Sequence, residues 1–357
     1  MDTIWWNKVT NASCFLETIV ASVQNGQSVL LELPDTIPWY MTMKEIIENE
    51  ISMQNSDSAC KYVLDTKVEP GEYLLKTFCK KEKQAKYRPL IGYPRFLAKS
   101  NDIVLNDRIL WIADVDKKQV QKWVDFIENY NKELEEGRKG CRFIIETREK
   151  CNISNRKGIQ FISFEKKIEY YDNYVFNMLA ASSLKGTQLF KQYLAEVVSI
   201  MFPNDIELSS KCISDGKRFL KNPIKVIQSI IEQESRSDGA YFNVSVKQEE
   251  LQERLWEAQI KIIFPLIEKH RSVIVKKYKS QIEVLLPIEG SYGETFNEVN
   301  EVELGTISYL QGKGKIQMSS DDISKVEKLK KARNDLAHIK TLAQSQVDEI
   351  FSFEIVR

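Results

Sequence analysis

The first half of the chain alternates short apolar runs with longer stretches in which apolar residues recur every three or four positions. Runs of this kind are typical of buried parallel strands, and the longer stretches predict helices that cover them. Strands are expected at residues 28–33, 108–116, 141–147 and 158–164. Helices are expected at 4–25, 39–51, 119–130 and 173–181. This alternation predicts an α/β fold with helices on both faces of a parallel sheet.

The second half shows helical spacing only. Helices are expected at 188–202, 209–220, 223–232, 247–285 and 301–310, with a turn at 203–205 and a last long helix that begins near Ser320. The polar segment 234–239 is the best candidate for a linker. The predicted fold class is therefore α/β followed by all-α. The expected domains are 1–182, a helical subdomain with linker at 183–238, and a helical bundle at 239–357.

The last long helix carries the residues with the clearest chemistry. We expect Ser320 or Asp321 to cap its start. Its apolar stripe consists of Ile323, Val326, Leu329, Leu336, Ile339 and Leu342. At about 100° per residue, Asn334 and His338 share a line roughly opposite this stripe, on the polar face, and Arg333 lies between the two faces. An outward-facing pair needs a second element to form a pocket, and a second copy of the helix is the simplest candidate.

The segment RNDLAH, from Arg333 to His338, resembles the signature of the HEPN superfamily. There an arginine, commonly followed by asparagine, precedes a histidine by about four to six residues on the last long helix of a small bundle. The resemblance covers residues 245–357 and implies a metal-independent endoribonuclease that acts as a homodimer and needs no cofactor. It implies that His338 is the general acid or base when a ribose 2′-hydroxyl attacks the phosphate. Arg333 would neutralise that phosphate, and Asn334 would orient the phosphate or the imidazole.

The same three residues also fit a helix without catalytic activity. Arg333 would then pair with Asp335 or with an acid elsewhere, and His338 would be solvated. A bundle of this family that is kept only for dimerisation is a further alternative. No feature of the sequence separates these alternatives from catalysis. The second functional hypothesis is therefore a non-catalytic dimerising scaffold or sensor subunit of a defence complex.

The segment after the first expected strand has the frame of a phosphate-binding loop but not its residues. It reads PDTIPWYMTMK at 34–44, with two prolines, no glycine, and Thr42 and Lys44 in reversed order. Because glycine-rich backbone N–H groups wrap the phosphates in such loops, we expect no nucleotide binding here. The strand expected at 108–116 ends in Asp114 and Asp116, as a Walker B strand ends in carboxylates. We interpret both as capping residues rather than as magnesium ligands.

Residues 1–180 as a whole resemble an inactive STAND-like or AAA-like P-loop module. The resemblance implies a regulatory domain that senses a partner protein or a trigger. The helices at 188–232 would form its winged-helix or lid subdomain, and since acids interrupt their basic residues, packing is favoured over DNA binding. Proteins that join such a module to a HEPN bundle resemble bacterial conflict and phage-defence components, in which a toxin-like RNA-cutting effector stops growth.

Charge and composition restrict the partners. The chain has 357 residues with 51 basic and 51 acidic side chains, so no net charge draws the whole molecule onto nucleic acid. RNA, with tRNA among the candidates, must be bound by a local patch. His270 and its basic neighbours belong either to such a patch or to a solvated cationic face. Six scattered cysteines without a metal-ligand pattern, and the lack of a signal or membrane segment, indicate a cytoplasmic protein with reduced thiols and no membrane partner.

Overall fold

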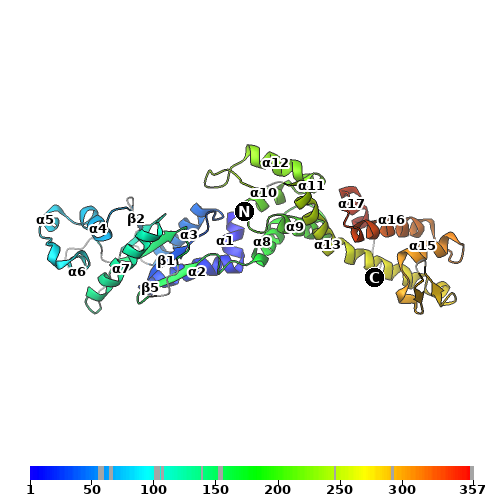
Figure 1. Cartoon of the computed structure of the whole chain (residues 1–357), viewed down its shortest axis with the longest axis horizontal. Helices are drawn as coiled ribbons and strands as arrows, with labels where there is room; N and C mark the ends of the chain where they lie inside the picture. Colours follow the sequence, from blue (N-terminus) through cyan, green and yellow to red (C-terminus); the bar gives the residue numbers. More distant parts are fainter. Residues whose placement is uncertain are drawn as a thin grey trace. The chain divides into compact units, whose positions relative to one another are not determined.

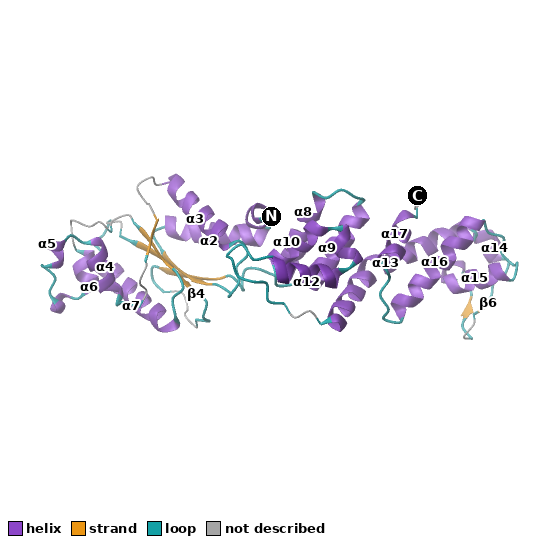
Figure 2. Cartoon of the chain, turned by 90° about the horizontal axis from the view of Figure 1, so that it is seen from above, coloured by secondary structure: helices purple, strands orange, loops and turns teal. Residues whose placement is uncertain are grey.

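The computed structural model of the chain forms two compact units, Met1–Asp172 and Asn173–Arg357 (Figure 1). It describes residues 1–54, 60–63, 67–99, 105, 108–137, 140–151, 156–244, 247–290 and 293–353. The first unit is built on a parallel sheet, and the second is almost entirely helical (Figure 2). The predicted order, an α/β part followed by a helical part, is confirmed.

The sheet of the first unit has five parallel strands in the order β2-β3-β4-β1-β5. The strands are β1 (Ser28–Glu32), β2 (Cys60–Tyr62), β3 (Ile109–Ile112), β4 (Arg142–Thr147) and β5 (Ile159–Ser163). The central strands are almost completely buried, which explains their uninterrupted apolar runs. The four predicted strands are confirmed, although the second is shorter than expected. β2 has no apolar run and therefore escapes prediction from the sequence.

Two groups of helices cover the sheet. One face lies against α2 (Thr10–Gln24) and α3 (Tyr40–Gln54), and α1 (Asp2–Lys8) packs against α2. The other face lies against α4 (Pro70–Phe78), α6 (Tyr93–Ala98) and α7 (Lys117–Glu133). There the strands pack Leu30, Leu110, Phe143 and Ile145 against Trp123 and Phe126 of α7. The predicted helix at 4–25 is wrong in one respect, because the buried Val9 is extended and divides it into α1 and α2.

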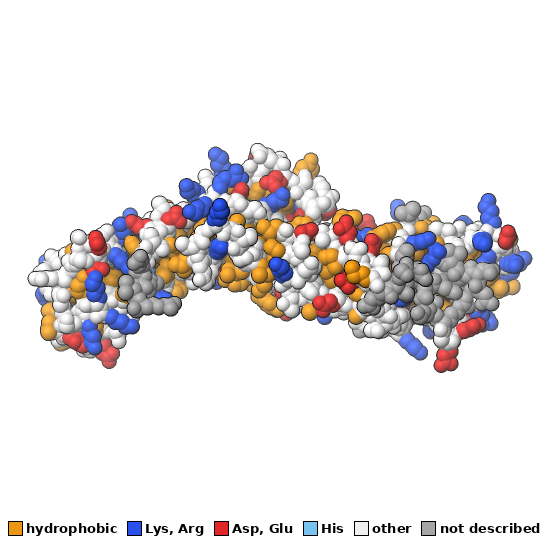
Figure 3. Space-filling view, turned by 180° about the vertical axis from the view of Figure 1, so that it is seen from behind, with side chains coloured by type: hydrophobic (Ala, Val, Ile, Leu, Met, Phe, Trp, Pro, Cys, Tyr) orange, Lys and Arg blue, Asp and Glu red, His pale blue; other side chains and the backbone are white. Residues whose placement is uncertain are grey.

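Residues 70–99, between β2 and β3, form a small helical subdomain in the first unit. It contains α4, α5 (Lys81–Gln84), the 3-10 helix η1 (Pro89–Ile91) and α6. Leu74 and Leu97 anchor it in the core beneath α7. Lys and Arg side chains are prominent on this end of the first unit, at the right of Figure 3.

The second unit is reached through α8 (Tyr170–Ser182). Its helices and strands are α9 (Gln188–Met201), α10 (Ile206–Asp215), α11 (Lys217–Lys221), α12 (Pro223–Gln233), α13 (Gln248–Lys277), α14 (Lys279–Glu283), β6 (Ile288–Glu289), β7 (Thr295–Phe296), η2 (Val299–Glu301), α15 (Leu304–Gly312), α16 (Ser320–Ala337) and α17 (Gln344–Ser352). Gly216, at φ +50°, divides the predicted helix 209–220 into α10 and α11. The long predicted helix is confirmed up to Lys277, and Pro265 lies inside it.

The segment predicted as a linker is tied to α10. Ser237 donates from its backbone N–H and its hydroxyl to the carboxylate of Glu207, at 2.8 and 2.6 Å. Arg236 pairs with Asp205, and its guanidinium lies 4.9 Å from the centre of the Phe242 ring. These bonds hold residues 235–237 of the predicted linker against the start of α10, as part of the folded unit.

No helix in the described part of the chain is both long enough and apolar enough to cross a membrane.

Candidate functional site

The helix that carries Arg333, Asn334 and His338 is shorter than predicted. α16 is capped by the hydroxyl of Ser319, which accepts from the N–H of Asp322, so the predicted cap at Ser320 or Asp321 is displaced by one residue or two. The helix ends at Ala337, and His338 follows its last helical residue. The apolar stripe therefore does not continue along a helix to Leu342.

The chain leaves α16 through a tightly hydrogen-bonded turn. The N–H of His338 donates to the carbonyl oxygens of Asn334 and Asp335, and the N–H of Lys340 donates back to Asp335 at 2.9 Å. This pattern belongs to helix ends whose next residue is left-handed, a position that glycine usually occupies. Here it is Ile339, at φ +58° and 69% exposed. Its placement in the apolar stripe was wrong, because the turn directs its side chain to solvent.

A β-branched residue is unfavourable in the left-handed region, so neighbouring contacts must hold the turn in place. Two residues of α13 do this. The indole N–H of Trp256 donates to the carbonyl of Leu336 at 2.8 Å. The buried amide of Gln259 exchanges hydrogen bonds with the N–H and carbonyl of Leu342, at 2.7 and 3.0 Å. The backbone is thus anchored to α13 on both sides of His338 and Ile339.

Asn334 and His338 lie on the solvent side of α16, as predicted. Both side chains are exposed, and neither forms a hydrogen bond with a described residue. Arg333 lies differently, since it is half-buried and its guanidinium is directed towards α13 and the start of α15. There Nη2 lies 3.2 Å from a carboxylate oxygen of Glu303, and Nε lies 3.8 Å from one of Glu268. The described residues show no hydrogen bond between Arg333 and His338 within one chain.

The surroundings of Arg333 form a balanced charge cluster. Glu268 also accepts a 2.7 Å hydrogen bond from Nε of Arg271. Two guanidinium groups therefore face two carboxylates, Glu268 and Glu303. Ion pairs with this degree of exposure contribute only about 0–1 kcal/mol. A phosphate group could consequently replace a carboxylate beside Arg333 at small cost.

A pocket of about 580 Å³ adjoins the turn after His338. Its walls are formed by Glu249, Gln252, Glu253, Trp256, Ile339, Lys340 and Thr341. Two carboxylates against one ammonium group make this pocket unsuitable for a phosphate. A phosphate site at the motif would therefore need groups from outside this pocket.

His270 is fully buried on α13, and the prediction that it faces RNA or solvent is wrong. Its ring meets the ring of Phe353 edge-on, with 5.8 Å between centroids. Neither ring nitrogen has a hydrogen-bond partner among the described residues. Burial, together with the nearby Lys325 and Lys269, lowers the pKa of His270 to about 4. The signal was present in the sequence, since His270 follows Ile263 and Ile267 at helical spacing on the same buried face.

The carboxyl edge of the sheet offers a second candidate position. β1 lies between β4 and β5, and the chain leaves β1 and β4 in opposite directions across the sheet, an arrangement that commonly produces a ligand crevice. Here the guanidinium of Arg148 donates to the carbonyl oxygens of Pro34 and Asp35. The loop after β1 therefore presents carbonyl oxygens to a cation, where a phosphate-binding loop presents N–H groups to an anion.

Lys44 and Asp116, which the sequence analysis compared with phosphate-binding and magnesium-binding residues, form contacts within the fold. Lys44 is buried, with its ammonium nitrogen 4.1 Å from the ring centre of Tyr62 and 5.0 Å from that of Trp111. Burial lowers its pKa, whereas burial raises the pKa of the neighbouring Glu146. Asp116 caps α7 by accepting the N–H of Gln119 at 2.8 Å, which confirms its interpretation as a capping residue.

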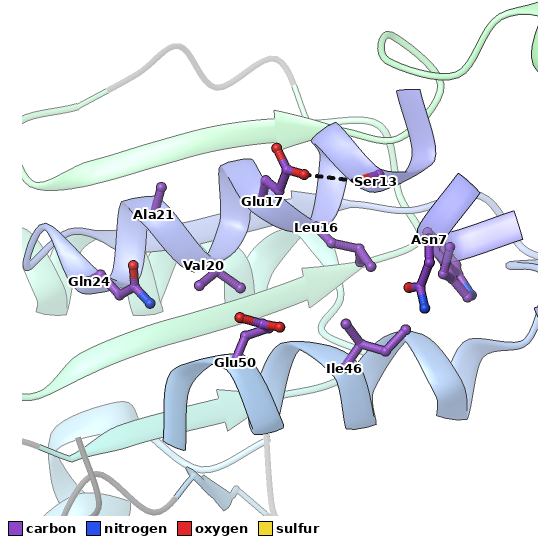
Figure 4. Close-up of a pocket in the computed structure, with 10 residues that line it drawn as sticks. Asn7, Ser13, Leu16, Glu17, Val20, Ala21, Gln24, Ile46 and Glu50 are labelled. Atoms are coloured by element: carbon purple, nitrogen blue, oxygen red, sulfur yellow. Dashed lines mark hydrogen bonds between the residues drawn. The ribbon is translucent and has the colours of Figure 1, made fainter. Parts of the chain in front are cut away.

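A second pocket, of about 300 Å³, lies between α2 and α3 (Figure 4). Its apolar side chains are those of Trp6, Leu16, Val20, Ala21 and Ile46. Glu17, which accepts a 2.9 Å hydrogen bond from Ser13, and Glu50 lie at its border. The lining combines apolar side chains with isolated acids and provides no arrangement of an acid, a base and a nucleophile.

No protein-family model matches this chain, and the search of curated proteins gave no match either.

Proposed function

We propose that the chain is a metal-independent endoribonuclease of the HEPN type, with an active site formed when two copies bring their α16 ends together. The observation that carries this proposal is the position of His338. Its imidazole is exposed and has no hydrogen-bond partner among the described residues, on a backbone that Trp256 and Gln259 hold firmly. The exposed imidazole is free to contact a substrate and exchange a proton with it. The fixed backbone keeps the position of the side chain defined.

The proposed reaction uses both imidazoles. His338 of one copy takes the proton of a ribose 2′-hydroxyl, and the 2′ oxygen attacks the adjacent phosphorus. The bond to the 5′ oxygen breaks, and His338 of the second copy donates a proton to that leaving oxygen. The products are a 2′,3′-cyclic phosphate and a 5′-hydroxyl. Arg333 leaves its carboxylate partners to neutralise the phosphate, and the Asn334 amide orients the phosphate or the imidazole.

In this proposal the first unit regulates the second. The five-stranded parallel sheet supports the likeness to a STAND-like or AAA-like module, and the cation-facing loop after β1 supports one that binds no nucleotide. A partner protein bound to this unit would control the nuclease in a bacterial defence or toxin-like system acting on RNA, with tRNA as one candidate.

The test is incubation of the full chain with total RNA and with tRNA in the presence of a chelator. We expect cleavage that leaves 2′,3′-cyclic phosphate ends, and we expect His338→Ala to abolish it. Lys315→Ala is the matched control, because Lys315 is an exposed side chain of the second unit that precedes α16 and lies outside the proposed site. Equal cleavage by the His338→Ala and Lys315→Ala variants would remove the proposal.

A second candidate is a dimerising scaffold without catalysis. The observation that favours it is the ion pairing of Arg333 with Glu303 and Glu268, which gives this arginine a structural partner in the single chain. The scaffold predicts no cleavage of any RNA at any protein concentration. It also predicts that the mass measured by light scattering is the same for the parent chain and for His338→Ala.

A further inference from the structure

The helical subdomain at residues 70–99 is strongly basic in a chain without net charge. It contains eight Lys and Arg residues but only two acids, Glu72 and Glu82. All of these residues lie in the described part of the chain, between the start of α4 and Lys99, the residue that follows α6. This is the kind of local patch that a neutral chain needs to hold a polyanion.

Much of this positive charge has no acidic partner. Glu72 pairs with Lys76, and Glu133 of α7 lies 3.7 Å from both Arg95 and Lys99. By contrast, Lys80, Lys81 and Lys86 are exposed and form no ion pair with a described residue. Their ammonium groups are therefore available to an anion from outside.

The patch surrounds an exposed apolar apex. Leu90 is completely exposed, and Ile91 beside it is 43% exposed, at the turn formed by η1. The residues on either side of this turn form a parallel stack of Tyr87 on Tyr93, with ring centres 4.4 Å apart and an angle of 8° between the planes. The guanidinium of Arg88 donates to the carbonyls of Ala85 and Tyr87, which fixes the start of the turn. The aliphatic side chains are thus held out into solvent rather than folded in.

We propose that this subdomain binds single-stranded RNA, with phosphates on Lys80, Lys81 and Lys86 and an unstacked base against Leu90 and Ile91. Ammonium groups with no competing carboxylate gain the most from phosphates, because counterions are released when they bind. Exposed aliphatic side chains pack against base faces or between bases in many nucleic-acid complexes. Binding of this kind tolerates many sequences and weakens steeply with salt.

An anionic membrane is the competing partner, and the observations favour RNA. Stable attachment to a membrane needs a broad apolar face or a lipid anchor in addition to basic residues. The apex offers two aliphatic side chains, and the stacked tyrosines that flank it in the sequence face each other instead of forming an apolar belt. Two aliphatic side chains are enough to contact one base of a nucleic-acid strand, since each base is a separate small apolar surface.

The inference rests on the proposed function only for the choice of RNA over other polyanions, and its test does not depend on cleavage. The probe is a fluorescent single-stranded 2′-O-methyl RNA of about 12 nucleotides, which has no 2′-hydroxyl to attack its phosphates. Binding to the full chain is measured by anisotropy at several salt concentrations. Lys81→Glu with Lys86→Glu is the test variant, and Lys118→Glu with Lys122→Glu on exposed positions of α7 is the matched control.

We expect the Lys81/Lys86 double variant to bind at least about tenfold more weakly and to lower the salt slope by about 1.4. The Lys118/Lys122 control should bind as the parent does, and Leu90→Ser should bind more weakly with an unchanged salt slope. Equal losses in the two double variants, or binding to phosphatidylserine vesicles without binding to the oligonucleotide, would overturn the proposal. If cleavage is absent but the expected binding is found, the nuclease proposal fails and this one stands.

Discussion

The indole N–H of Trp256 donates to the carbonyl oxygen of Leu336, two residues before His338, at 2.8 Å. The same carbonyl accepts the N–H of Ile339 at 3.2 Å. The end of α16 and the turn that follows it are therefore fixed by a side chain from α13. The same hydrogen bond therefore contributes to the stability of the bundle and fixes the position of the proposed catalytic imidazole.

Replacing Trp256 with Phe should weaken this end of the helix. An aromatic ring remains, although it is smaller than the indole, and the carbonyl of Leu336 loses one of its two donors. A hydrogen bond of this kind contributes about 0.5–1.5 kcal/mol, so we expect a decrease of that size in the free energy of unfolding, measured with urea. We also expect slower RNA cleavage, since the backbone at His338 gains freedom. An unchanged urea midpoint would show that the bond does not hold the turn.

Replacing Ile339 with Gly should stabilise the protein. The residue is left-handed and mostly exposed, so glycine removes backbone strain and little packing. Strain of about 1–2 kcal/mol is partly offset by the greater flexibility of glycine in the unfolded chain. The expected gain is about 0.5–1 kcal/mol in urea unfolding. Lys340→Gly is the control and should destabilise, because Lys340 is not left-handed.

This turn also marks the limit of what the sequence could predict. Apolar spacing located α16 and placed Asn334 and His338 on its solvent side, because both depend on local periodicity. It continued the helix to Leu342 because no glycine or proline announces the end. The stop is imposed by Trp256 and Gln259, about 80 residues earlier in the chain. Contacts across such a sequence distance are invisible to local patterns.

Charged residues show the same difference between what local sequence patterns predict and what distant contacts determine. The sequence contains a basic run at 80–88, but local patterns did not single it out. Its importance depends on which acids reach which basic residues, and only the fold places Glu133 beside Arg95 and Lys99. The ion-pair partners of Arg333 could not be predicted from the sequence either. The sequence suggested Asp335 or an unnamed acid, and the structure shows Glu303 and Glu268.

Acid should destabilise the second unit through His270. The unfolded ring takes up a proton near its ordinary pKa of 6.5, whereas the buried ring does so only near 4. Between these values the unfolded state binds more protons, so stability falls as the pH falls through this window, by up to about 3 kcal/mol. Above pH 6.5 both forms are neutral, and the group has no effect on the pH dependence.

Proton NMR can follow this directly, because the chain contains only two histidines, His270 and His338. The resonance assigned to His270, identified by its loss in His270→Leu, should not titrate between pH 7 and 5 while the protein is folded. The His270→Leu variant should lose this part of the acid sensitivity in urea unfolding. Titration of the His270 resonance near pH 6.5 in the folded protein would contradict its burial.

Replacing Glu303 with Gln should release part of the hold on Arg333. The change removes one of the two carboxylates that compete with a phosphate, and Glu268 remains. Because exposed pairs contribute about 0–1 kcal/mol, kcat/KM for RNA cleavage should rise by up to about fivefold. Glu349→Gln is the matched control, since it removes the exposed Lys328–Glu349 pair and leaves Arg333 untouched. A fall in cleavage with Glu303→Gln alone would mean instead that Glu303 positions the arginine, because losing the carboxylate would then misplace the guanidinium rather than free it.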